Sequence, residues 1–123
     1  MTVRRVAILS GILCAIVEIT PPAWATVDNL KSFKAAYPDK DAKAYSCKIC
    51  HQHVMGRKDD HNAYGAALKQ SKAPGDAKKL VEKDFRALEG EDADGDGASN
   101  LQEITAGTAP GDPTSLPTGP AQP

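Results

Sequence analysis

The chain has 123 residues, of which 41% are hydrophobic and 25% charged, and its formal net charge is −1. This length corresponds to one domain, and the slight acidic excess gives no reason to expect a nucleic-acid partner. After position 25 the aromatic residues are Phe33, Tyr37, Tyr45, Tyr64 and Phe85. That supply is thin for a self-sufficient core, so we expect the polypeptide without a bound group to fold poorly.

The first 25 residues have the pattern of an export signal. Arg4 and Arg5 precede an apolar run over residues 6–17, and Ala23-Trp24-Ala25 has the small-x-small pattern of a cleavage site. The apolar run is shorter than the roughly 20 residues that a membrane-spanning helix needs. We therefore expect cleavage after this tripeptide, a mature chain that does not span a membrane, and a periplasmic or other extracytoplasmic location. An uncleaved membrane anchor is the alternative.

Helical patterns dominate the rest of the sequence, and no stretch alternates like a strand. We expect helices over residues 28–36, 62–71, 76–88 and 101–106. Asp28, Asn62 and Asp76 are suitable N-caps for the first three. The 76–88 helix has an apolar stripe formed by Val81, Phe85 and Leu88.

Shorter segments connect these helices. Residues 39–44 are expected to form a polar connector, with a helical turn opening near Tyr45 and a loop over 51–61. Pro38 should end the first helix, residues 73–75 should turn, and Gly107 should end the last helix. The tail from residue 108 has five prolines in 16 residues, which excludes regular structure.

Residues 47–51 read Cys-Lys-Ile-Cys-His, which is the attachment motif of a c-type haem. Two thiols three positions apart lie on one side of a helical turn, so both can add to vinyl groups on one porphyrin edge. We expect covalent haem c at Cys47 and Cys50, with His51 as the proximal iron ligand. A disulfide would leave the histidine unexplained. A zinc half-site would lack a companion pair of ligands at zinc spacing.

The opposite face of the iron has three candidate ligands, His53, Met55 and His61. The chain must pass around the porphyrin edge, a detour of roughly 25–30 Å, and extended chain covers about 3.3–3.6 Å per residue. Two or four residues are too few, whereas the ten from His51 to His61 are just enough. We expect His61 as the distal ligand. An open or water-bound position, or a ligand from another chain, is the alternative.

Residues 92–103 fit the calcium-loop pattern D-x-D-x-D-G-x₅-E. Three aspartates this close repel one another unless a cation neutralises them. The expected ligands are Asp92, Asp94, Asp96, the carbonyl of Ala98, Asn100 directly or through water, and Glu103. A lone loop with a short exiting helix predicts a structural Ca²⁺ site that holds the 76–88 helix to the C-terminal segment. A solvated acidic turn is the alternative.

Together these motifs resemble a family of small exported bacterial monohaem c-type cytochromes. In that family the haem motif is followed by Asn-x-Tyr-Gly, a calcium-type loop and a Gly-Thr-x-Pro-Gly-Asp-Pro tail, which correspond here to residues 47–51, 62–65, 92–103 and 107–113. The resemblance covers residues 46–117 and implies an all-α, cytochrome c-like helical domain around one haem, with irregular loops and a proline-rich tail. We divide the chain into a signal peptide (1–25), a monohaem domain (26–117) and a disordered tail (118–123).

Charge is unevenly distributed along the chain. Residues 26–88 hold 13 Lys and Arg against 8 Asp and Glu, whereas residues 89–123 hold 7 acidic residues and no Lys or Arg. Such a split is typical of a basic partner-docking face and an acidic cation site. The lysines nearest the haem motif, which would attract an acidic partner, are Lys43, Lys48, Lys58 and Lys69.

The resemblance implies extracytoplasmic electron transfer, and three functional hypotheses follow. The first is a single-electron carrier, not an enzyme, that acts alone or as a haem subunit of a larger complex. Its partner would be a redox protein or a membrane electron-transfer complex. The second is a haem enzyme or a gas- or peroxide-binding protein with an open sixth position. The third is a calcium-stabilised interaction module in which haem is structural.

Overall fold

The structure is a computed structural model that describes residues 25–57, 59–73 and 79–119. Residues 1–24 of the predicted signal, the predicted cap Asp76 and the end of the predicted tail lie outside these ranges. Within the described ranges the regular elements are helices and 3₁₀ turns, without a strand, so the all-α prediction is confirmed at that level. None of the helices described is long and apolar enough to cross a membrane.

Helix α1 (Ala25–Ala36) supplies the first side chains of the core. It begins three residues before the predicted start, so Asp28 lies in its first turn and the prediction of this residue as N-cap is wrong. The last turns place Phe33 in the core, where it is 2% exposed. The helix ends before Pro38 as predicted, because proline disfavours helical backbone at the residue before it.

Two 3₁₀ turns follow α1 and lead to the histidine loop. In the first, η1 (Ala42–Ala44), the Asp41 carboxylate accepts a hydrogen bond from the backbone N–H of Lys43 at 3.0 Å. The second, η2 (Cys47–Ile49), is the helical turn that the sequence predicted for the cysteine motif. The predicted loop over 51–61 follows, and its two end residues pair in an isolated antiparallel bridge.

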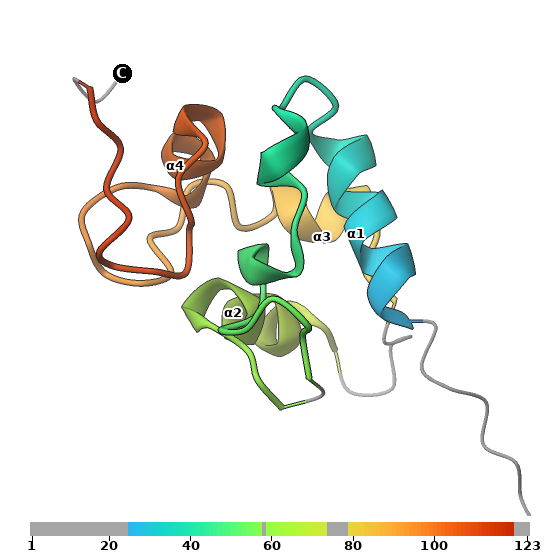
Figure 1. Ribbon diagram of the computed structural model, residues 1–123. Coiled ribbons are helices and arrows are strands. Elements are labelled where there is room, and N and C mark those ends of the chain that lie inside the picture. The colour runs from blue at the N-terminus through green and yellow to red at the C-terminus, as the bar shows by residue number, and fades with distance from the viewer. Residues whose placement is uncertain (1–24, 58, 74–78, 120–123) are drawn as a thin grey trace, which may run out of the picture.

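Helix α2 (Ala63–Ser71) lies beneath η2 in the view of Figure 1. The predicted cap is confirmed, since the Asn62 carboxamide oxygen accepts a hydrogen bond from the Gly65 N–H at 2.9 Å. The buried side of the helix carries Tyr64 and Leu68, which are 0% and 1% exposed. The cysteine turn therefore packs against this helix.

Helix α3 (Glu82–Arg86) is much shorter than the predicted 76–88 helix. The prediction is wrong over residues 79–81, and Val81 is 41% exposed and does not join the apolar stripe. Two hydrogen bonds explain the late start. The Asn29 side chain accepts one from the Leu80 N–H at 2.8 Å, and the Asp84 carboxylate accepts one from the Val81 N–H at 2.8 Å. The chain before α3 is thus bound to α1 in extended form.

Helix α4 (Asn100–Ala106) confirms the predicted last helix. Ser99 caps it by accepting a hydrogen bond from the Gln102 N–H at 3.3 Å. Gly107 ends it with φ of 78°, a left-handed conformation that glycine adopts without strain. As predicted, the tail forms no helix over its described residues, 108–119. Figure 1 shows this tail running beside the acidic loop on the side of the molecule opposite α1.

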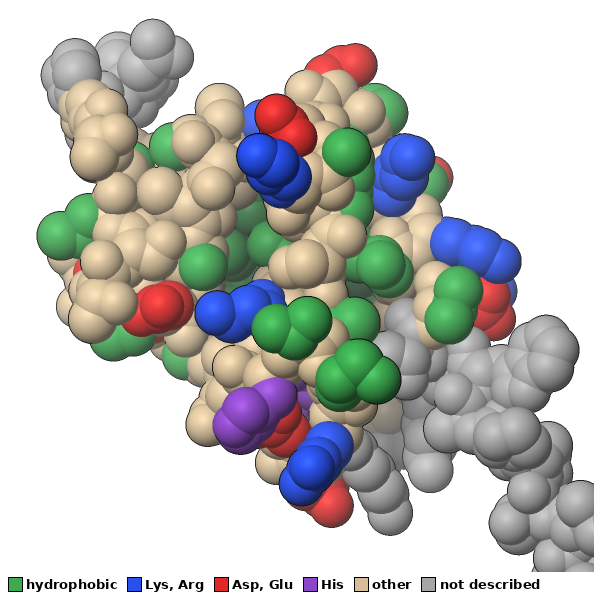
Figure 2. All heavy atoms as spheres, in the orientation of Figure 1, with side chains coloured by type: hydrophobic (Ala, Val, Ile, Leu, Met, Phe, Trp, Pro, Cys, Tyr) green, Lys and Arg blue, Asp and Glu red, His purple; other side chains and the backbone are tan. Residues whose placement is uncertain are grey.

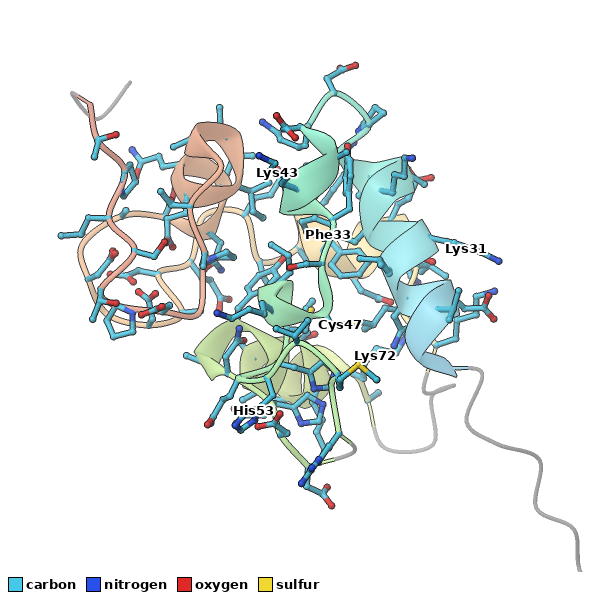
Figure 3. All side chains as sticks on the ribbon, in the orientation of Figure 1. Lys31, Phe33, Lys43, Cys47, His53 and Lys72 are labelled. Carbon is cyan, nitrogen blue, oxygen red and sulfur yellow. The ribbon has the colours of Figure 1, made fainter. Side chains whose placement is uncertain are left out.

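The core lies where α1, α2, α3 and η2 meet. Phe33 makes edge-on contacts with Phe85, at 5.4 Å between ring centroids, and with Tyr45 at 6.3 Å. Figure 3 shows Phe33 in the middle of the fold. The buried hydrophobic residues are Phe33, Ala36, Tyr37, Ile49, Tyr64, Leu68, Phe85, Leu88 and Ile104. Ile49 comes from the cysteine motif itself, which anchors that motif to the core.

Replacement of Phe85 tests how α3 contributes to this core. We predict that Phe85→Ala lowers the free energy of unfolding by about 3–4 kcal/mol, because the ring is 1% exposed and leaves a cavity beside Phe33. The matched control is Val81→Ala, which should change it by less than about 0.5 kcal/mol since this side chain is exposed. Denaturant unfolding measures both. Equal losses of unfolding free energy in the two variants would instead support the predicted continuous stripe, in which Val81 is buried as Phe85 is.

Candidate functional site

The cysteine motif is wound into one compact turn. The Cys50 N–H donates to the Cys47 carbonyl at 3.2 Å, and the His51 N–H donates to the same carbonyl at 2.9 Å. Both cysteines are free thiols. Cys47 lies above α2 in the view of Figure 3. One compact turn therefore carries both thiols and is followed directly by the imidazole.

Cys50 is the more deeply placed of the two thiols. Burial raises its pKa to about 12, and the neighbouring Cys47 adds to the effect. The thiolate is the nucleophilic form of cysteine. Cys50 therefore stays a neutral thiol at physiological pH in this fold.

The His51 ring is held in one orientation by the loop that follows it. Its Nδ1 lies 3.0 Å from the Asp60 carbonyl oxygen. A carbonyl only accepts hydrogen bonds, so Nδ1 is the donor here and Nε2 is the nitrogen left to bind a metal. This is the usual state of a metal-binding histidine, whose second nitrogen donates to a carbonyl or carboxylate.

Gly56 lies against the same ring. A Cβ at this position would lie 3.0 Å from His51 Cδ2 and 3.3 Å from Nε2. Its φ of 35° also favours glycine. Sequence reasoning identified neither Gly56 nor the Asp60 carbonyl as part of the site. A glycine in an otherwise polar loop was the one available signal, and a backbone carbonyl leaves none.

His61 lies directly beside His51. The two rings are stacked, with centroids 5.0 Å apart and planes inclined by 27°. Burial lowers the pKa of His61, and the nearby His51 and Lys69 lower it further, which favours the neutral imidazole. A distal iron ligand would instead face His51 Nε2 end-on across the porphyrin. The stacked arrangement of the two rings differs from that one, and His61 as the distal ligand stays a prediction.

The other two ligand candidates point away from His51. The His53 side chain is 74% exposed, and its Nδ1 is 2.7 Å from the Asp60 carboxylate. This hydrogen bond lowers the pKa of Asp60. Met55 is 85% exposed and Val54 is 65% exposed. Figure 2 shows hydrophobic side chains on this face next to a histidine and basic side chains. Two large apolar residues in the loop after the motif are thus uncovered.

A second polar cluster is the acidic loop before α4. The Asp92 carboxylate accepts hydrogen bonds from Gly95 N–H at 2.7 Å and Gly97 N–H at 2.9 Å. Gly97 has φ of 98°, which suits the glycine that the calcium-loop pattern requires there. Carboxylate oxygens of Asp92, Asp94 and Asp96 all lie within 4.8 Å of one another. The backbone thus folds the three aspartates around one point.

Glu103 turns its carboxylate into the interior. The residue is 0% exposed, and both of its carboxylate oxygens are buried without a hydrogen-bond partner. One oxygen each of Asp94 and Asp96 is in the same state. Burial raises the pKa of Glu103 to about 8, and Asp94, Asp96 and Asp92 add to the rise. Buried polar atoms normally have partners, and these four oxygens are placed where they could hold a cation.

Asn100 connects the acidic loop to α3. Its side-chain N–H₂ donates to the Leu88 carbonyl at 2.7 Å, and its carboxamide oxygen accepts from the Ala93 N–H at 3.2 Å. The oxygen that would bind a cation therefore already has one partner. Ligation by Asn100, directly or through water, and by the Ala98 carbonyl stays a prediction.

No protein-family model matches the chain, and comparisons with curated proteins and with solved structures also give no match.

The buried carboxyl group predicts an unusual pH dependence for the cation-free protein. The pKa of Glu103 is about 8 in the fold and near its ordinary 4.5 in the unfolded chain. The folded state thus binds more protons between these values, so this stabilisation is complete below pH 4.5 and is lost by pH 8. Denaturant unfolding in chelator should show stability falling with pH.

Glu103→Gln isolates this contribution, because it keeps the shape and removes the titration. The variant should lose stability over pH 5–8 less than the parent does. Glu91→Gln, at an exposed neighbouring carboxylate, is the control and should follow the parent. A parent and a Glu103→Gln variant with the same pH profile would contradict the prediction.

Proposed function

We propose that this protein is a small c-type cytochrome that carries single electrons outside the cytoplasm. Haem c would be attached through thioethers to Cys47 and Cys50, with His51 Nε2 as the proximal ligand. The observation that carries the proposal is the arrangement of His51, whose Nδ1 bonds to the Asp60 carbonyl and whose backbone closes a turn that holds two free thiols. A disulfide would not require this arrangement.

The protein's own contribution would be to hold and cover the cofactor. A haem bound here supplies an iron that changes between the ferric and ferrous states. The Asp60 carbonyl orients the imidazole and increases its basicity. Val54 and Met55 offer apolar surface that a porphyrin would cover, which favours binding by about 25 cal/mol per Å². The fully buried Tyr64 hydroxyl, which has no partner within the described residues, would gain one from a bound group with acceptor atoms.

Charge supports a partner of opposite sign. Of the lysines that the sequence places around the motif, Lys43, Lys48 and Lys69 are exposed, and Lys58 lies outside the described residues. Exposed lysines increase the association rate with an acidic surface. We infer a redox protein or a membrane electron-transfer complex as partner. The signal pattern supports a periplasmic or other extracytoplasmic site of action.

A second function is favoured by the stacked histidines. If His61 stays beside His51, the sixth position of the iron is open to a small ligand such as peroxide or a gas. The protein would then be a haem enzyme or a ligand-binding protein, with His61 outside the coordination sphere. The stacking at 5.0 Å is the specific support for this alternative.

We further propose that the acidic loop binds Ca²⁺ through Asp92, Asp94, Asp96 and Glu103, completed by the Ala98 carbonyl and Asn100. The unpartnered oxygens of Glu103, Asp94 and Asp96 support this. Hard oxygen ligands and four negative charges are what Ca²⁺ prefers. Since Asn100 bonds to the Leu88 carbonyl, a bound ion would stabilise the junction between α3 and α4.

The role of His61 is tested by its replacement in the haem-loaded protein. We expect a low-spin, six-coordinate absorption spectrum in the parent and a high-spin spectrum in His61→Ala, because one axial imidazole is lost. His53→Ala is the matched control and should leave the spectrum unchanged, since that side chain is exposed and paired with Asp60. A parent that is already high-spin would favour the open-site alternative. A colourless chain at polypeptide mass would refute haem attachment.

Calcium binding is tested by calorimetry. We expect the binding heat of the parent to be lost in Asp92→Ala and Glu103→Ala, because each removes a charged ligand. Asp39→Ala removes an exposed aspartate outside the loop and should bind as the parent does. Equal heats in the parent and the two loop variants would show that the loop is a solvated acidic turn.

A further inference from the structure

Asn62 bonds to three consecutive backbone carbonyls of the cysteine turn. Its side-chain N–H₂ donates to the Lys48 carbonyl at 2.9 Å and to the Ile49 carbonyl at 3.0 Å. Its backbone N–H donates to the Cys50 carbonyl at 3.1 Å. One residue therefore fixes the turn that carries both thiols.

The fourth bond of Asn62 connects that turn to α2. The carboxamide oxygen accepts from Gly65 N–H and caps the helix. Asparagine alone among the good N-cap residues combines this acceptor with two side-chain N–H donors. Aspartate or serine could cap α2 equally well, but aspartate has no donor when ionised and serine has only one. Helix capping by itself therefore does not explain the use of asparagine here.

The helix also approaches the cysteine turn too closely for a side chain at Gly65. A Cβ there would lie 2.0 Å from the Cys50 carbonyl oxygen. The first turn of α2 thus packs directly on the backbone of Cys50. Its distance from the turn is set by backbone contact and leaves no room for adjustment.

The C-terminal tail closes the other side of Asn62. A Cβ at Gly111 would lie 2.5 Å from Asn62 Cγ and 2.8 Å from its side-chain nitrogen. The tail is itself held to α4, because the Thr108 N–H donates to the Glu103 carbonyl at 2.9 Å, and Pro110 is fully buried. The Asn62 side chain is therefore enclosed between the cysteine turn, α2 and the tail.

We propose that Asn62 is a positioning residue for the haem: it fixes the spacing of Cys47, Cys50 and His51, and the tail keeps it in place through Gly111. This inference rests on the proposed haem attachment and adds the residue that sets its geometry. Because His51 follows Cys50 directly, a change in the turn moves the imidazole together with the second thiol. Both attachment and iron potential then depend on one carboxamide.

The first test is Asn62→Asp in the full-length chain, expressed in a host that attaches haem c outside the cytoplasm. Aspartate keeps the acceptor that caps α2, so helix content measured by circular dichroism should stay unchanged. It lacks the two donors and repels the Lys48 and Ile49 carbonyls. We expect about a tenfold lower yield of doubly attached haem, the size of loss typical for partners of metal ligands. The pyridine haemochrome spectrum distinguishes one thioether from two.

The midpoint potential of the molecules that do carry haem is the second readout. It should shift in Asn62→Asp, whereas a loss of stability alone would reduce the yield and leave this potential unchanged. Asn29→Ala is the matched control. This variant removes a carboxamide that accepts a hydrogen bond from the Leu80 N–H and supports the fold outside the cysteine motif. Its potential and thioether count should equal those of the parent.

Gly111→Ala tests the tail and keeps Asn62 itself. The added methyl group must displace the carboxamide, so this variant should reproduce both changes of Asn62→Asp. Gly119→Ala is its control in the same tail, because a Cβ there meets nothing within 4 Å. If Asn62→Asp yields no holoprotein, the thioether count and the midpoint potential of Gly111→Ala test the inference in its place.

The two failures are distinguishable. A parent without covalent haem would refute the proposed function. If the parent carries haem and both Asn62→Asp and Gly111→Ala have the same thioether count and potential as the parent, this inference alone is overturned.

Discussion

The fold depends on the contacts between its segments, because its described helices have only 5 to 12 residues. Helices this short are not stable alone in water. The strongest connection is the set of bonds around Asn62, which joins the cysteine turn, α2 and, through Gly111, the tail. Residues separated by about half the chain thereby form one unit. The core side chains pack around this unit from the α1 side.

Within the described residues, groups that could bind a cofactor or a cation gather at two places. At the cysteine turn, two free thiols are followed directly by an imidazole whose Nδ1 bonds to the Asp60 carbonyl. At the acidic loop, four carboxylate oxygens of Glu103, Asp94 and Asp96 are buried without partners. Elsewhere the polar side chains are mostly paired or exposed, as expected for a native fold. This contrast is why we propose a cofactor at the first place and a cation at the second.

Local signals predicted much of the fold. Asn62 and Gly107 set the ends of α2 and α4 through contacts within a few residues, and these boundaries are confirmed. The start of α3 was mispredicted because Asn29, some 50 residues away, holds Leu80 in extended chain. For the candidate site, the motifs gave the chemical groups. They could not give the Asp60 carbonyl or the approach of Gly111, since these are contacts between distant parts of the backbone.

The burial of the Cys50 thiol limits the stage of folding at which the proposed haem could be attached to it. A thiol whose pKa is raised to about 12 is almost entirely protonated at neutral pH and reacts poorly. The tail approaches this region from the other side, since its Gly111 lies against Asn62, which donates to the Cys50 carbonyl. If haem is attached as proposed, its bond to Cys50 would form more readily before the tail packs against Asn62 than after it. Truncation of the tail would prolong the interval in which the second sulfur is reactive.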